Sequence, residues 1–144
     1  MTRGIRNCNP LNIRRVAGTS WRGEDRNPAE HDKQFVQFRS MEWGLRAAFC
    51  LLRTYQKKYN ATCIQDIIYR WAPPRENNTP AYVRRVCLLT GYGGQERLTE
   101  KEWPRLVRAM AVIESTAWLD EDLIDRSFKL YNFYEPHSIG RKNP

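Results

Sequence analysis

Hydrophobic side chains recur with a helical period along most of the chain after residue 40. Over residues 41–58 the apolar positions follow a period near 3.6 residues, which predicts a long amphipathic helix. Its apolar face comprises Trp43, Ala47, Cys50, Leu51 and Tyr55. The same pattern predicts further helices over residues 62–71, 79–90, 99–114 and 120–131. The chain is therefore predicted to be mostly α, with about five helices.

Several helix ends carry recognisable signals. Thr62-Cys-Ile-Gln65 and Thr99-Glu-Lys-Glu102 have the spacing of capping boxes, so each is expected to open a helix. Thr79 is predicted as an N-cap because Pro80, which suits the first helical position, follows it. Gly91 is expected to end that helix. Residues 140–144 are predicted to be a frayed end.

The first 40 residues have a different character. Asparagine, glycine and proline are frequent there, a composition typical of hydrogen-bonded loops. Phe35-Val-Gln-Phe38 is expected to be extended, and a small β-hairpin is predicted near residues 11–39. Apolar residues such as Trp21 can attach this loop to the core while its amide side chains face a ligand, which favours a binding site. The alternative is a loop that only covers the core.

Composition limits the class of protein. With 144 residues and 41% hydrophobic side chains, the chain is expected to form a single domain, 1–144, and to be a monomer. The net charge of +8 favours an acidic partner: nucleic acid, a membrane surface or an anionic cell-wall polymer. No block of basic residues marks a nucleic-acid tail, so nucleic acid is disfavoured. No signal peptide and no apolar run of ~20 residues is present, so the protein is expected to be made in the cytoplasm without membrane insertion.

The cysteines and histidines do not indicate a metal or a cofactor. Cys8, Cys50, Cys63 and Cys87 form no CxxC pair, and His31 and His137 do not lie at ligand spacing from them. Cys50 and Cys87 fall in apolar helical runs and are expected to be buried thiols. Neither histidine is near a nucleophile-elbow sequence, so a serine or cysteine triad is not supported.

Glu114 is the strongest candidate for a catalytic carboxylate. It follows Ala109-Met-Ala-Val-Ile113, the most apolar segment of the chain, so its carboxyl is expected at the end of a buried helix with Ser115 and Thr116 as hydrogen-bond partners. A helix C-terminus and apolar surroundings both disfavour the charged form, so the pKa of Glu114 is predicted to be raised. Glycosidic cleavage needs such an acid. The alternative is an exposed glutamate without a chemical role.

The order of several motifs resembles a known family. The segments concerned are Asn7-Cys-Asn-Pro-Leu-Asn-Ile-Arg14, Trp21-Arg-Gly23, Phe35-Val-Gln-Phe38, Ser40 to Ala47, and Trp71 to Tyr82. In this order they resemble the glucosaminidase-type autolysins of the lysozyme-like superfamily. The chain is also similar to small phage-related peptidoglycan-degrading proteins that begin with an Arg-Gly-Ile-Arg-Asn-Asn-Asn-Pro-like motif. The resemblance implies a lysozyme-like single domain.

One departure from the autolysins concerns the catalytic glutamate. Those enzymes carry it on a helix ahead of the asparagine loop, whereas only four residues precede Ile5 here. The comparable segment, Val112-Ile-Glu-Ser115, lies late in the chain. A circularly permuted lysozyme-like domain would bring the two together, because termini that lie close in space allow an element to change its place in the sequence.

The resemblance implies a role for individual residues. Glu114 would be the general acid and Tyr82 would stabilise the transition state, while Glu24, Asp25 or Asp32 would supply a second carboxylate or be solvated charges. Asn7, Asn9 and Asn12 would orient the loop or bind sugar amides, and sugar contacts are also implied for Trp21 and Asn78; for Trp21 a place in the core is an equal alternative.

The predicted function is a peptidoglycan-degrading glycosidase: a muramidase, a glucosaminidase or a lytic transglycosylase. Its partner would be the glycan strand, reached through lysis, a virion or a secretion system. The alternatives are a non-catalytic cell-wall-binding component of a virion or secretion system, and a basic helical protein that binds nucleic acid.

Overall fold

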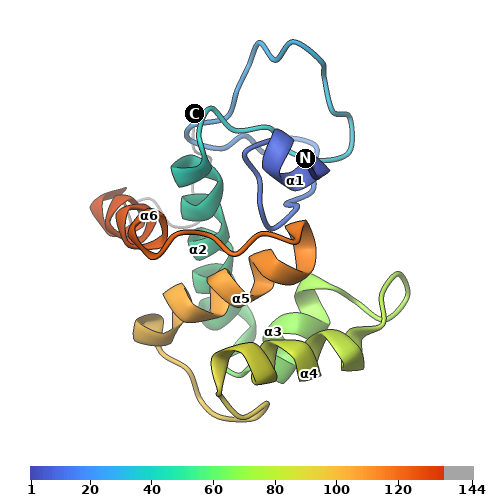
Figure 1. Ribbon diagram of the computed structural model, residues 1–144, viewed down its shortest axis with the longest axis vertical. Coiled ribbons are helices and arrows are strands. Elements are labelled where there is room, and N and C mark those ends of the chain that lie inside the picture. The colour runs from blue at the N-terminus through green and yellow to red at the C-terminus, as the bar shows by residue number, and fades with distance from the viewer. Residues whose placement is uncertain (135–144) are drawn as a thin grey trace.

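The computed structural model describes residues 1–134, and Figure 1 shows their arrangement. This part of the chain contains six α-helices and one 3₁₀ turn. The helices are α1 (Arg3–Arg6), α2 (Met41–Tyr59), α3 (Ile64–Trp71), α4 (Thr79–Thr90), α5 (Trp103–Ser115) and α6 (Glu121–Tyr134), and the turn η1 is Glu100–Glu102. The prediction of a mostly α protein is confirmed.

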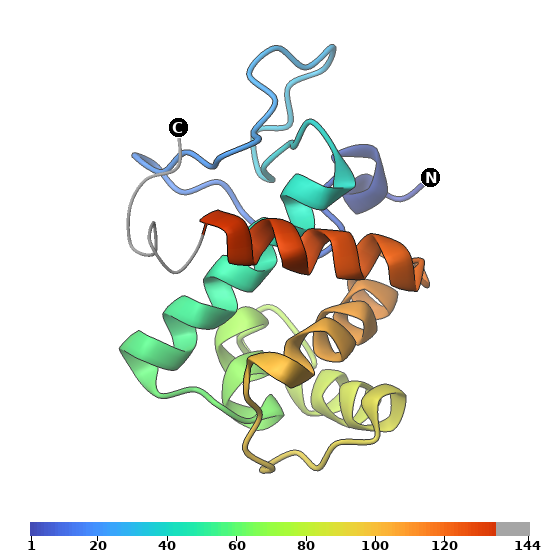
Figure 2. The same cartoon turned by 90° about the vertical axis from the view of Figure 1, so that its left-hand side faces the viewer.

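The long helix α2 runs through the middle of the molecule, and α6 packs across it (Figure 2). The contact is aromatic. The ring centroid of Phe49 on α2 lies 5.0 Å from that of Phe128 and 5.8 Å from that of Tyr131 on α6. Trp103 of α5 lies 6.2 Å from Tyr131. Since Phe49, Trp103 and Tyr131 are all buried, this cluster forms one centre of the hydrophobic core.

Helices α3 and α4 and the start of α5 form the part of the molecule away from the N-terminus, while the C-terminal end of α5 reaches α1. Helix α4 packs against both α3 and α5, and α5 also packs against α2 (Figure 1). Ile64 of α3, Val86 of α4 and Leu106 of α5 are completely buried. These contacts follow from the helical spacing of apolar residues, because each helix has one hydrophobic side to cover.

The helix ends match the predictions in part. The capping box at Thr99 forms with Glu102, but it opens η1, which leads directly into α5. The box predicted at Thr62 is wrong, since α3 begins at Ile64 after an N-cap residue, Cys63, that makes no capping hydrogen bond. The N-cap of α4 is Asn78 and not Thr79: its side chain accepts a hydrogen bond from the Ala81 amide at 3.3 Å.

The predicted hairpin region contains very little β structure. Two isolated antiparallel bridges, Arg14 with Phe35 and Glu24 with Phe38, are the β pairings of residues 1–134, and no regular strand occurs there. Most of residues 7–40 form an irregular segment, called the N-terminal segment below, that lies over one end of α2 (Figure 1). In place of a regular ladder, scattered backbone hydrogen bonds, such as that from the Val36 amide to the Ile13 carbonyl at 3.0 Å, hold it together with side-chain hydrogen bonds.

Close backbone packing joins this segment to α2. A Cβ atom on Gly44 would lie 2.0 Å from the carbonyl oxygen of Cys8, so no larger residue fits there. Cys50 is buried as predicted, whereas Cys87 is only half-buried. The predictions for His137 and residues 140–144 lie outside the described residues. Within the described helices, none is long and apolar enough to cross a membrane.

Candidate active site

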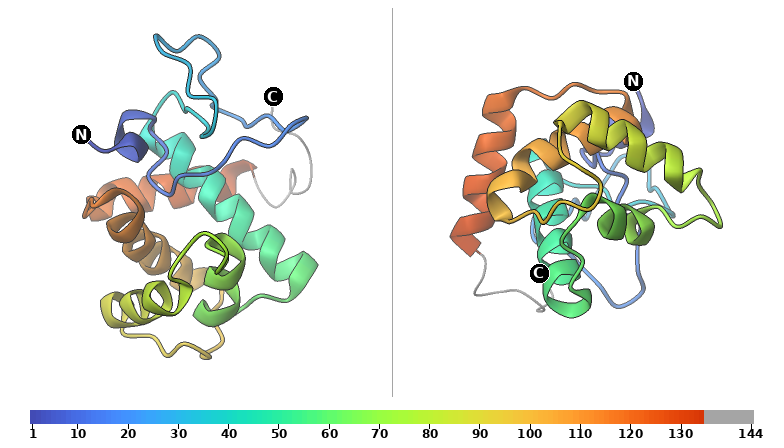
Figure 3. Two further views of the ribbon diagram at one scale, coloured as in Figure 1. Left: turned by 90° about the vertical axis from the view of Figure 1, so that its right-hand side faces the viewer. Right: turned by 90° about the horizontal axis from the view of Figure 1, so that it is seen from below.

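A cleft of about 530 Å³ lies between the N-terminal segment and the helices α2 and α3. The left panel of Figure 3 looks at this side of the molecule, where the N-terminal segment lies above α3 and the loop that follows it. The lining comprises Asn12, Ile13, Arg14, Val16, Thr19, Trp21, Phe35, Leu51, Tyr55, Arg70, Trp71, Ala72, Pro73, Glu76, Asn77 and Glu114.

Glu114 presents its carboxyl to this cleft from the last turn of α5. Its Oε1 accepts a hydrogen bond from Nδ2 of Asn12 at 3.1 Å, and its Oε2 accepts one from the hydroxyl of Tyr82 at 3.0 Å. Desolvation by burial raises the pKa of Glu114, as predicted, against weaker lowering by these two hydrogen bonds, by the charge of Arg14 and by a hydrogen bond with Trp71. The site therefore contains a carboxyl group that favours its protonated form more than an exposed glutamate does.

The end of α5 is attached to the N-terminal segment. Asn12 adopts a left-handed backbone conformation (φ 54°), and its Nδ2 also donates to the carbonyl of Glu114 at 3.1 Å. Ser115 donates from Oγ to the carbonyl of Pro10 at 2.7 Å, and Thr2 donates to the carbonyl of Ser115 at 3.1 Å. The prediction that Ser115 and Thr116 would hydrogen-bond the Glu114 carboxyl is wrong, because their hydroxyls donate to backbone carbonyls instead.

Tyr82 reaches Glu114 from α4 and is buried. Burial, with the adjacent Glu114 carboxyl, raises the pKa of Tyr82 well above its usual range, so the phenol stays protonated. A protonated phenol can donate to the Glu114 carboxylate and thereby stabilise its charged form.

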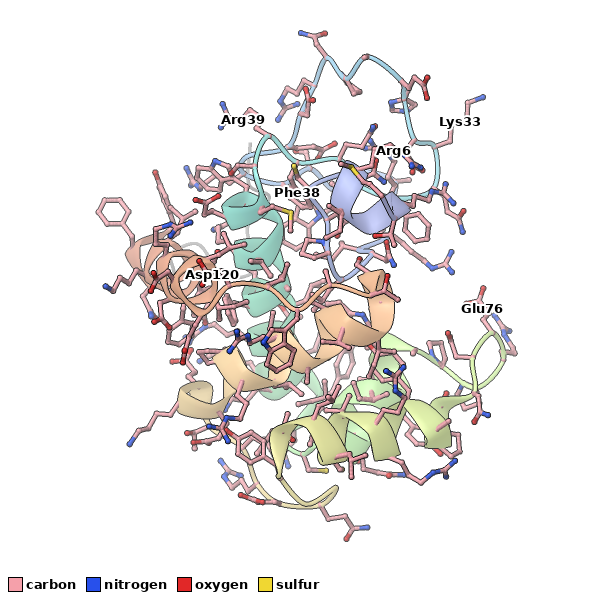
Figure 4. The ribbon with its side chains drawn as sticks, viewed as in Figure 1. Arg6, Lys33, Phe38, Arg39, Glu76 and Asp120 are labelled. Atoms are coloured by element: carbon pink, nitrogen blue, oxygen red, sulfur yellow. The ribbon has the colours of Figure 1, made fainter. Side chains whose placement is uncertain are left out.

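The walls of the cleft combine aromatic and charged side chains. Trp21 and Phe35 come from the N-terminal segment, while Tyr55 and Trp71 form an edge-to-face pair with centroids 6.1 Å apart. Half-exposed aromatic rings of this kind suit the apolar faces of sugar rings. Glu76, which Figure 4 shows on the loop between α3 and α4, is the one other carboxylate among the described lining residues.

Three of the asparagines considered for sugar binding form hydrogen bonds within the protein instead. Asn9 is completely buried, and its side chain bonds to the backbone of Ile13 and Val36. Asn7 is buried and donates to Asp32 at 2.9 Å. Asn78 caps α4. Asn7 and Asn9 therefore orient the loop, which is the other role implied for them. The prediction that Asn7, Asn9 and Asn78 contact sugar is corrected, because they do not line the cleft, whereas Asn12 and Trp21 do.

The carboxylates proposed as partners of Glu114 also have structural contacts. Glu24 forms an ion pair with Arg15 at 2.9 Å and accepts a hydrogen bond from the Trp21 amide. Asp32 forms a two-point contact with Arg3, at 2.8 Å for each oxygen, and this hydrogen bonding holds the pKa of Asp32 far below its usual range. Neither residue, nor Asp25, lines the cleft. The prediction of Glu24 as a second catalytic carboxylate is therefore corrected.

Arg14 and Trp71 were not predicted as site residues. Trp71 follows the hydrophobic pattern of its helix, which made it resemble a core residue, and only its position directly before Ala72-Pro73-Pro74 hinted at a surface. Arg14 is one of many dispersed arginines, so no local signal separated it from the others. Among residues 1–134, no three His, Cys, Asp or Glu side chains are grouped to hold a metal ion.

These features define a small, mostly α protein that presents a half-buried carboxyl to an aromatic cleft. The chain matches no protein-family model. It is similar to Protein P5 of Pseudoalteromonas phage PM2, with 38% identity over 115 residues that cover 78% of this chain and 71% of the phage protein. The chain belongs to the family of this phage protein.

Proposed function

We propose that this protein cleaves the glycan strand of peptidoglycan, with Glu114 as the general acid. The observation that carries the proposal is the environment of Glu114: a half-buried carboxyl with a raised pKa, hydrogen-bonded by Asn12 and Tyr82 on the wall of an open cleft. An acid of this kind can protonate a leaving oxygen near neutral pH.

The reaction proceeds in two proton transfers. Glu114 donates its proton to the glycosidic oxygen while the bond between that oxygen and the anomeric carbon breaks. The resulting oxocarbenium-like centre is captured by an oxygen nucleophile, whose proton returns to the Glu114 carboxylate. Tyr82 stabilises this carboxylate between the two steps, because its hydroxyl already donates to Oε2.

The nature of the nucleophile decides the product. An inverting or retaining hydrolase of the usual type needs a second carboxylate beside the sugar. Glu76, the other described carboxylate of the cleft, is exposed and pairs with Arg14 at 3.8 Å. This arrangement favours a nucleophile from the substrate itself, and hence a lytic transglycosylase that leaves an anhydro sugar, over a two-carboxylate hydrolase.

We also propose that the fold is lysozyme-like and circularly permuted. The supporting contact joins Asn12 to Glu114 across 102 positions of the sequence, so an early asparagine loop and a late glutamate helix share one cleft. A phage relative is in keeping with delivery by lysis or by a virion. The net charge of +8 suits a polyanionic wall.

The experiment is digestion of purified peptidoglycan by the wild type, by Glu114→Gln and by Glu121→Gln, with the products identified by mass spectrometry. Glu121 is exposed on α6, so its variant is the matched control for loss of a carboxylate. We expect Glu114→Gln to reduce the rate by at least ~100-fold and Glu121→Gln to leave it unchanged. Anhydro ends would identify a transglycosylase, and water-added ends a hydrolase.

Three outcomes would contradict the proposal. Equal digestion by Glu114→Gln and the wild type would remove Glu114 from the mechanism. No digestion by the wild type, together with tight sedimentation with insoluble peptidoglycan, would favour a binding module. A nucleic-acid complex that survives moderate salt would favour a basic helical protein that binds nucleic acid.

A further inference from the structure

The cleft contains four ionisable side chains, the basic Arg14 and Arg70 and the acidic Glu76 and Glu114. Glu114 is held by Asn12 and Tyr82. Arg70 lies over a tyrosine ring, with its guanidinium carbon 3.4 Å from the centroid of the Tyr59 ring. These contacts leave Arg14 as the cation of the cleft whose interactions are weakest.

The backbone of Arg14 is held in place, but the positive charge of its side chain is only weakly paired. Its backbone pairs with Phe35 in an antiparallel bridge, and its guanidinium lies 5.4 Å from the centroid of the Phe35 ring, which Arg3 also approaches at 4.5 Å. Among residues 1–134, Arg14 forms an ion pair with Glu76, at 3.8 Å, and both side chains are more than half exposed. Such an exposed pair contributes little energy, so a ligand anion can replace Glu76.

Arg14 also lies close enough to Glu114 to act on it electrostatically. Its positive charge favours the ionised form of the carboxyl and so lowers the pKa of Glu114. The other groups that act on Glu114 are the neutral side chains of Asn12, Tyr82 and Trp71. A ligand group bound to Arg14 would therefore occupy the same cleft as the bond to be cleaved.

We propose that Arg14 is a subsite for a carboxylate carried by the glycan strand, so that the enzyme prefers anionic strands to neutral ones. The inference rests on the proposed function. In peptidoglycan the carboxylate can belong to the peptide stem or, on strands without peptide, to the lactyl group of the sugar. A guanidinium binds either through two parallel hydrogen bonds.

The experiment compares three forms of peptidoglycan: native strands, strands whose carboxylates have been chemically amidated, and strands stripped of peptide by an amidase. We expect the wild type to cleave native strands roughly 10-fold faster than amidated ones, because a charged hydrogen-bonded pair is lost. Arg14→Gln should cleave both at one low rate, and Arg14→Lys should retain part of the preference. Arg84→Gln, which changes an exposed arginine of α4 outside the cleft, should behave like the wild type.

The stripped strands identify the source of the carboxylate. A wild-type rate that persists on them shows that the subsite also accepts the lactyl carboxylate, whereas a rate that falls to the amidated level restricts the subsite to a carboxylate of the peptide stem. A second measurement is the pH profile. Arg14→Gln removes a charge that favours ionised Glu114, so the pKa of Glu114 should rise and the alkaline limb of activity should move to higher pH.

The inference is overturned if the wild type cleaves native and amidated strands equally, or if Arg14→Gln keeps the preference. Failure of the proposed function is distinct from both results, because the wild type would then cleave none of the three substrates.

Discussion

Asn9 should matter for stability and not for substrate contact. It belongs to the N-terminal segment and is completely buried. Its Nδ2 donates to the carbonyls of Ile13 and Val36 at 2.9 and 2.8 Å, and its Oδ1 accepts from the Ile13 amide at 2.9 Å. The side chain thus connects two stretches of backbone that no regular strand joins.

The effect of Asn9→Ala can be worked out from these three hydrogen bonds. Each contributes about 1 kcal/mol net, and their loss leaves polar backbone groups of Ile13 and Val36 without partners in a buried place. We therefore expect the free energy of unfolding to fall by about 3 kcal/mol. For a chain of this size, such a loss corresponds to a Tm roughly 10 °C lower.

The measurement is urea and thermal denaturation followed by circular dichroism. Asn27→Ala is the matched control, because Asn27 is an exposed asparagine of the same segment; its free energy of unfolding should stay within ~0.5 kcal/mol of the wild type. If Asn9→Ala were as stable as the wild type but had a raised KM, Asn9 would contact substrate and our interpretation would be refuted.

Two further variants test other contacts. Tyr82→Phe removes the donor that favours ionised Glu114, so the pKa of Glu114 should rise and the alkaline limb of activity should move to higher pH, with a rate loss of roughly 10-fold; an unchanged pH profile would argue against this contact. Gly44→Ala places a Cβ against the Cys8 carbonyl and should destabilise the protein by about 3 kcal/mol in urea denaturation. Gly93→Ala, whose Cβ would have no neighbour closer than 3.7 Å, should be nearly neutral, and equal stability of the two variants would contradict the packing argument.

The helices could be predicted from the sequence because their signals are local. The period of apolar residues predicted a helix over 41–58, and α2 is Met41–Tyr59. The pattern over 120–131 corresponds to α6, Glu121–Tyr134. The start of α4 was misplaced by one residue because Asn78 and Thr79 are both good N-cap residues, and only the structure shows which side chain bonds to Ala81.

The site could be predicted only in part. Glu114 was recognised from the apolar segment before it, since that segment predicts both burial and a raised pKa. The asparagines could not be told apart in the same way. Asn9 and Asn12 are three positions apart and chemically identical, yet one bonds to the core backbone and the other to Glu114. Which of them faces the cleft depends on the left-handed turn at Asn12, and such a backbone angle leaves no periodic pattern.

The position of the acid depends on the irregular segment that lies beside it. Asn12 holds the Glu114 carboxyl and Ser115 is bonded to Pro10, so the end of α5 is attached to a segment without regular secondary structure. That segment is ordered by single buried contacts, above all those of Asn9 and the close approach of Cys8 to Gly44. Changes that loosen these contacts should therefore release the carboxyl from its hydrogen bonds even where they touch no cleft residue. Stability and the position of the acid are linked here because the segment that these contacts order also supplies Asn12, which donates to the Glu114 carboxyl.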